Sequence, residues 1–128
     1  MDIWIENYPI KYLGVSDNVK EVISIADCIV LPSYYREGVP KILLESASMS
    51  KPIITTHNVG CKEVVDHGVN GYLCQIKNVD DLVIMMKKIL MLDPDKLKKM
   101  GERGREKVEK EFDENIVLNK YVKSIEVV

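Results

Sequence analysis

Two glutamates, Glu37 and Glu45, lie eight positions apart and are the best candidates in this sequence for ligand binding or catalysis. Glu37 precedes a predicted helix that opens at Pro40. Glu45 lies five residues beyond Pro40 on that helix, a rise of about 7.5 Å. One carboxylate is therefore expected at the mouth of a loop and the other further along the helix. Two acceptors placed in this way can hold hydroxyl groups on both sides of a third, anionic group.

The start of the same helix favours that anionic group. The unpaired N–H groups of residues 39–42 carry a partial positive charge, which suits a phosphate. Gly38 lets the backbone approach a ligand closely. Val39 and Lys41 can each donate a backbone N–H, whereas Pro40 cannot, although it is well placed as the first helical residue. A hexose, a diphosphate and a ribose in series would match this pattern, so we expect a nucleotide sugar as the ligand.

Strand-like and helix-like segments alternate along the chain with short connections, which predicts an α/β fold: a parallel sheet with flanking helices. The run at residues 28–31 is wholly apolar, as expected for a strand buried on both faces. Ligands in such folds bind beyond the carboxyl ends of the strands, so the loop before Pro40 should lie at the ligand site. Strands are expected at residues 10–13, 28–31, 53–56 and 72–76. Helices are expected near Val19, from Pro40, at residues 61–65, and from Asn78, Asp93 and Asp113.

Apolar positions predict which sides of the later helices face inward. In the helix that Asn78 caps, these are Val79, Leu82, Val83, Met86 and Ile89. In the helix that begins at Asp93-Pro94, they are Leu97, Met100, Val108 and Phe112.

Composition excludes several classes of protein. The 128 residues carry a net charge of −2, without the basic excess of a nucleic-acid-binding protein. No apolar run approaches the roughly 18 residues that span a membrane, and no signal peptide is visible, so we expect a cytoplasmic protein. The cysteines Cys28, Cys61 and Cys74 are odd in number and form no CxxC pair, which indicates buried free thiols and no metal site.

The string EGVPKILLE, from Glu37 to Glu45, resembles the E-x7-E motif of retaining GT-B glycosyltransferases of the group 1, or family 4, type. The neighbouring strings ADCIVLPS, LLESASMSKPIITT and GCKEVVDHGVNGYL resemble the same family, over about residues 10–112. The resemblance implies the Rossmann-like C-terminal half of a GT-B fold. It also implies metal-independent chemistry without a cofactor, because the helix dipole and basic side chains stabilise the departing diphosphate.

The roles of individual residues follow from the resemblance. Glu37 matches the acid that binds the donor sugar near the reacting carbon and is the implied catalytic residue. Glu45 matches the acid that binds the ribose hydroxyls. The stretch lining the sugar and diphosphate corresponds to Gly38, Val39, Pro40 and Lys41. The implied activity is transfer of a hexosyl or N-acetylhexosaminyl group from a UDP- or GDP-sugar to a glycan or lipid-linked acceptor, in polysaccharide or glycoconjugate biosynthesis.

Two parts of the family pattern have no match here: the Arg and Lys that clamp the diphosphate, and the N-terminal domain that binds the acceptor. Residues 1–128 are therefore expected to form a single, truncated domain with C-terminal helices over about 78–125, and with little or no activity alone. The alternative is a non-catalytic α/β interaction or regulatory module. Its exposed sheet edge, where missing strands should pair, would favour self-association.

The remaining charged residues have plainer interpretations. Basic residues alternate with acids from Asp95 on, which is typical of a solvated helical face. The basic positions are Lys87, Lys88, Lys98, Lys99, Arg103, Arg105, Lys107 and Lys110. The alternative is attraction to an anionic membrane surface that carries a lipid-linked acceptor, at the inner face of the membrane. His57 and His67 are expected to be surface residues, and Glu63 to cap or orient the short helix at residues 61–65.

Overall fold

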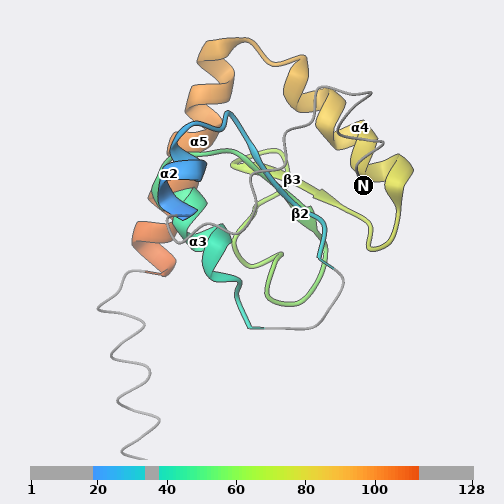
Figure 1. The fold of residues 1–128 in the computed structure, drawn as a ribbon, viewed down its shortest axis with the longest axis horizontal. Coiled ribbons are helices and arrows are strands. Elements are labelled where there is room, and N and C mark those ends of the chain that lie inside the picture. Colours follow the sequence, from blue (N-terminus) through green and yellow to red (C-terminus); the bar gives the residue numbers. More distant parts are fainter. Residues whose placement is uncertain (1–18, 34–37, 113–128) are drawn as a thin grey trace, which may run out of the picture.

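The computed structural model describes residues 19–33 and 38–112, which form a three-stranded parallel sheet between two layers of helices (Figure 1). The strand order is β1-β2-β3. The predicted α/β class is confirmed, while the strand at residues 10–13 and the helix from Asp113 lie outside the described residues. The elements are α2 (Val19–Ser24), β1 (Ile29–Leu31), α3 (Lys41–Ser48), β2 (Ile53–Thr56), β3 (Gly71–Cys74), α4 (Val79–Leu90) and α5 (Pro94–Glu111).

Strand β2 is the buried centre of this sheet, because β1 and β3 pair with its two edges and helices cover both of its faces. Ile53 packs with Leu43 of α3 and Val108 of α5. Its neighbour Ile54 points to the other face and packs with Met85 of α4. This alternation along β2 joins the two helical layers into one core.

Strand β1 is less buried than its apolar sequence predicts. Val30 is 37% exposed, so the prediction of a strand buried on both faces is wrong for the described part of the chain. The reason is position: β1 lies at an edge of the described sheet, and β2 holds the central place.

Helix α4 starts where the sequence predicts, and Leu82 and Ile89 of its predicted inward face pack in the core. Met85 and Ile89 are buried, whereas Val79, Val83 and Met86 are 72%, 39% and 42% exposed. The predicted inward face is therefore wrong for these three residues. Apolar side chains cover more than the buried side of α4, so the sequence does not show which of them meet the sheet.

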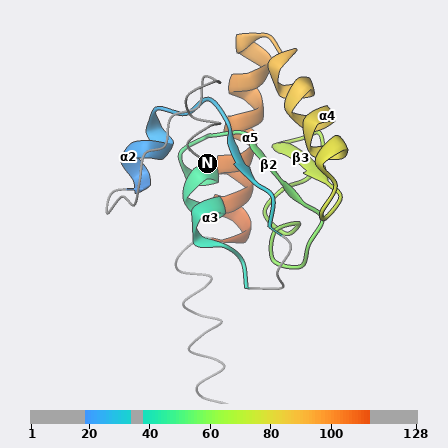
Figure 2. The same ribbon diagram turned by 45° about the vertical axis from the view of Figure 1, so that its right-hand side comes forward.

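Helices α3 and α5 lie side by side on the opposite face of the sheet (Figures 1 and 2). A Cβ atom at Gly101 of α5 would lie 1.9 Å from the carbonyl oxygen of Ser50, just beyond α3. Gly104, one turn later, lies against the side chain of Asn70. The missing side chain at Gly101 thus lets α5 contact the backbone after α3.

Candidate functional site

The carboxyl end of β1 is held by two buried threonines of β2. The Thr55 hydroxyl donates to the carbonyl oxygen of Leu31 at 2.8 Å, and the Thr56 hydroxyl donates to that of Ser33. These bonds fix the start of the predicted ligand loop. Sequence reasoning did not single out either threonine, although two polar residues at the end of a buried strand are a usable signal.

The described part of the loop resumes at Gly38, whereas Glu37 lies outside the described residues. An added Cβ at Gly38 would meet no atom within 4 Å, so the space around this residue is open. Val39 and Pro40 are half-buried, and Val39 packs against the core cluster that contains Leu43. The segment is thus anchored on its core side and open at Gly38.

Helix α3 begins at Lys41, one residue later than predicted, with Pro40 as its N-cap. The carbonyl oxygen of Pro40 accepts from the Leu43 amide at 3.1 Å. Proline has no side-chain acceptor, so the N-cap side chain pairs with no amide of the first turn. In contrast, Asn78 and Asp93 cap α4 and α5 with their side chains.

Glu45 lies one turn into α3, with its side chain 19% exposed. Lys41 Nζ lies 3.7 Å from Glu45 Oε1, but the Lys41 side chain is 89% exposed. Ion pairs of this kind contribute little to stability, so Lys41 can move away without much cost. The Glu45 carboxylate is therefore positioned by α3, and its ion pair with Lys41 costs little to break.

The segment after β2 forms consecutive turns, so the predicted helix at residues 61–65 is wrong. The Gly60 amide donates to Glu63 Oε2 at 2.6 Å. The turns bury Cys61, Val64 and Val65, and a helix would bury the same residues. The expectation that Glu63 orients this segment is confirmed, with a turn in place of a helix.

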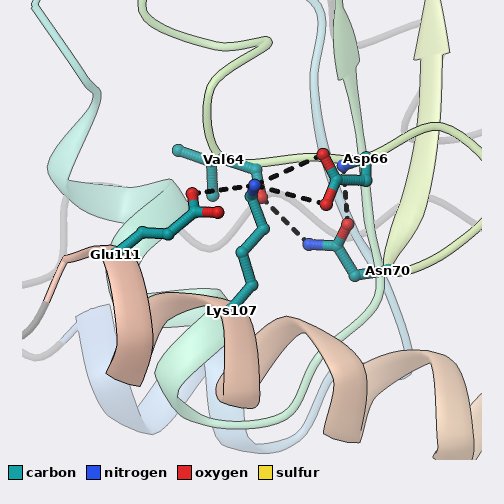
Figure 3. Close-up of polar contacts among 5 residues, drawn as sticks. All are labelled: Val64, Asp66, Asn70, Lys107 and Glu111. Atoms are coloured by element: carbon teal, nitrogen blue, oxygen red, sulfur yellow. Dashed lines mark hydrogen bonds and ion pairs between the residues drawn. The ribbon is translucent and has the colours of Figure 1, made fainter.

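The buried side chain of Asn70 bonds to backbone groups of the turn that precedes it (Figure 3). Asn70 Oδ1 accepts from the Asp66 amide at 2.7 Å, and Asn70 Nδ2 donates to the carbonyl oxygen of Val64 at 2.9 Å. Lys107 of α5 pairs with Asp66 at 3.3 Å and with Glu111 at 2.9 Å. These contacts tie the turn to α5.

This network assigns a structural role to the string EVVDHGVNG, which resembles the family motif. Glu63 and Asn70 hold turns through backbone groups. A Cβ at Gly71 would lie 1.9 Å from the carbonyl oxygen of Ile53, so β3 needs glycine at this point of contact with β2. In the described structure this string builds the fold beside the site.

An open cavity of about 630 Å³ adjoins the start of α3. Three of its lining residues are basic and three are acidic, so it carries no excess of positive charge. Its lining comprises Val39, Lys62, Glu63, Asp66, Lys107, Lys110, Glu111 and Phe112.

The cysteines are free, and Cys61 and Cys74 are buried while Cys28 is half-buried, so the prediction of unpaired thiols is confirmed. Within residues 19–33 and 38–112, no three His, Cys, Asp or Glu side chains gather as a metal site. Metal-independent chemistry stays a prediction. Over the same ranges, no helix combines the length and hydrophobicity that a membrane crossing requires.

The fold is that of the GT-B glycosyltransferases. The Anabaena protein HepE, solved in complex with UDP, superposes with a TM-score of 0.85 at 20% identity, over 99% of this chain and 34% of that one. A glycosyltransferase from Rickettsia africae superposes with a TM-score of 0.81 at 24% identity, over 95% of this chain and 32% of that one. This confirms the predicted Rossmann-like C-terminal half.

The sequence profile described as "Glycosyl transferases group 1" matches residues 7–107. The chain belongs to this family, as its resemblance predicted. It is 34% identical over 115 residues to N-acetyl-alpha-D-glucosaminyl L-malate synthase of Bacillus anthracis. The aligned region covers 88% of this chain and 29% of that enzyme. The chain thus spans about 30% of the length of the curated relatives that it matches.

Proposed function

We propose that this chain is the donor-binding part of a retaining glycosyltransferase. The donor is a UDP- or GDP-sugar, and the transferred group is a hexosyl or N-acetylhexosaminyl group. The observation that carries the proposal is the position of Glu45 on α3, whose uncapped first turn follows the β1 loop at the carboxyl end of the sheet. Membership of the group 1 family supports the same conclusion.

The donor would lie along the start of α3. Glu45 would accept hydrogen bonds from the ribose hydroxyls, and the Lys41 amide would face the diphosphate together with the positive end of the helix dipole. Gly38, Val39 and Pro40 would line the sugar and diphosphate, with Gly38 on the open side. Glu37 would contact the donor sugar near the reacting carbon.

The reaction would break the bond between the anomeric carbon and the diphosphate oxygen and join that carbon to the oxygen of an acceptor hydroxyl, whose proton would leave with the departing nucleoside diphosphate. The start of α3 would stabilise the negative charge that develops on the departing diphosphate, without a metal ion. This interaction grows as the bond breaks, so it would lower the barrier as well as aid binding.

The acceptor would be a glycan or a lipid-linked sugar, bound by a part of a longer protein. One relative, 32% identical over 114 residues, is the N,N'-diacetylbacillosaminyl-diphospho-undecaprenol alpha-1,3-N-acetylgalactosaminyltransferase of Campylobacter jejuni. A lipid-linked acceptor would bring the cytoplasmic protein to the inner face of the membrane. Without an acceptor site, the chain alone would show little or no transfer.

Calorimetry with UDP, GDP and their sugar conjugates tests donor binding. We expect measurable affinity for one nucleotide series, and a loss of about tenfold or more in Glu45→Gln, as for hydrogen bonds to a charged group. Glu109→Gln is the matched control, because Glu109 lies on the exposed side of α5 and pairs with Arg105. Unchanged affinity in Glu45→Gln would remove the ribose role.

A further inference from the structure

Helix α4 and its C-cap Met91 carry six exposed apolar side chains. Patches of this kind mark interaction surfaces. Four of the six follow each other at intervals of four, three and four residues, so they form one stripe along the helix. The stripe consists of Val79 (72% exposed), Val83 (39%), Met86 (42%) and Leu90 (82%).

The spacing of this stripe is that of the d-a-d-a positions of a coiled-coil heptad. The intervals also read the same in both directions. A second copy of α4 running antiparallel would therefore place its Leu90 opposite Val79 and its Met86 opposite Val83. The stripe is complementary to itself, as a two-fold interface requires.

The charges beside the stripe have the same symmetry. Asp80 and Lys87 are seven residues apart, so they lie on one side of the stripe, in the first and last turns of α4. In the antiparallel pair, Asp80 of each copy would lie beside Lys87 of the other. Within the part of the chain that the structure describes, neither residue forms an ion pair.

The outer edge of β3, in contrast, is closed to another strand. The Leu73 amide donates to His67 Nδ1 at 3.0 Å, and the Gln75 amide donates to Asp81 Oδ2 at 2.6 Å. These side chains occupy the donors that a pairing strand would need. His67 is exposed, as predicted, and its ring nitrogen also helps to close this edge of β3, so self-association by the β3 edge is disfavoured.

We propose that the chain forms an antiparallel two-fold dimer through α4, with the apolar stripe at its centre and Asp80–Lys87 pairs on one side. The proposal rests on α4 alone and does not depend on donor binding. A 12-residue helix is only about 18 Å long, and stable interfaces bury at least about 1,200 Å². The dimer is thus weak and forms in concentrated solution.

Sedimentation equilibrium of the full chain over a range of concentrations tests the proposal. We expect reversible dimerisation, and a monomer throughout in Val83→Asp, with far-UV circular dichroism and melting temperature unchanged. Val69→Asp is the matched control, because Val69 is 44% exposed and lies outside α4. A wild-type monomer at every concentration, or a dimer that survives Val83→Asp, would overturn the proposal.

A charge exchange tests the orientation. Asp80→Lys and Lys87→Asp should each weaken dimerisation about tenfold, because each breaks two symmetric pairs. The combined variant should restore it, which only the antiparallel pairing explains. Failure of this rescue contradicts the geometry. A monomer that binds phosphatidylglycerol vesicles through the stripe, or that melts earlier in Val83→Asp, would mean that a membrane or the chain itself covers α4.

Discussion

Lys107 of α5 forms an ion pair with Asp66 of the turn after β2, with 3.3 Å between Nζ and Oδ2. The Lys107 side chain is only 12% exposed, and it also reaches Glu111 at 2.9 Å. Burial by itself lowers the pKa of Lys107, but hydrogen bonds to Glu111 and Asp66 outweigh it, so the pKa is raised. This side chain joins α5 to the segment that supports the site.

Replacing Lys107 by alanine should lower the free energy of unfolding by about 1 kcal/mol, through lost packing of its stem and the lost pairs. The loss stays modest because Asp66 and Glu111 are more than half exposed and can be hydrated. Urea denaturation measures it. Arg105→Ala, which removes an exposed pair with Glu109, should change stability by less than about 0.5 kcal/mol. Equal losses in both variants would argue against the role of Lys107.

Gly101 and Gly104 of α5 should respond to alanine in opposite ways. At Gly101 the new Cβ would lie 1.9 Å from the Ser50 carbonyl oxygen, so α5 must move, and we expect a loss of about 2 kcal/mol or more. At Gly104 the nearest atoms lie 3.5 Å away, an ordinary contact. Because alanine favours helix by up to about 1 kcal/mol, Gly104→Ala should be neutral or stabilising. Thermal unfolding distinguishes the two, and similar melting temperatures would contradict the close approach.

Local signals predicted the elements well. Asn78 and Asp93 are side-chain caps recognisable from sequence, and both begin a helix where expected. The turns after β2 were harder to predict. Glu63 binds the Gly60 amide, and Val64 and Val65 lie in the core, so the apolar pattern of these turns is the same as that of a short helix.

Tertiary arrangement explains the other differences. The exposed side of α4 depends on where β2 and β3 lie, which no helical period encodes. In the site, the string around Glu45 marked the start of α3, whereas the hydroxyl contacts of Thr55 and Thr56 to β1 are visible only once the strands are paired.

Burial raises the pKa of the Cys28 thiol to about 11 from an ordinary 9.0, with a smaller rise from Asp27 and an opposing hydrogen bond from the Ile54 backbone. Burial, with Asp81, also raises the pKa of Cys74. A thiol whose pKa is higher in the folded than in the unfolded state stabilises the folded state. This contribution is fully present below the pKa of the unfolded state and is lost as pH rises through the pKa of the folded state.

Stability should therefore fall between about pH 9 and pH 11, as the unfolded chain loses thiol protons first. Urea denaturation at both ends of this window measures the fall, and Cys28→Ala should reduce it. The difference between wild type and variant is the informative quantity. The same fall in both would contradict the assignment to Cys28.

Glu45 should bind the ribose of a nucleotide donor, and a thermodynamic cycle of binding measurements isolates this contact. Calorimetry would compare UDP with its 2′,3′-dideoxy analogue, each against wild type and Glu45→Gln; if the donor series is GDP, the same cycle uses guanine nucleotides. We expect Glu45→Gln to weaken binding of the ribonucleotide about tenfold or more and to leave binding of the dideoxy analogue unchanged. Equal losses for both ligands, or none for either, would contradict this role of Glu45.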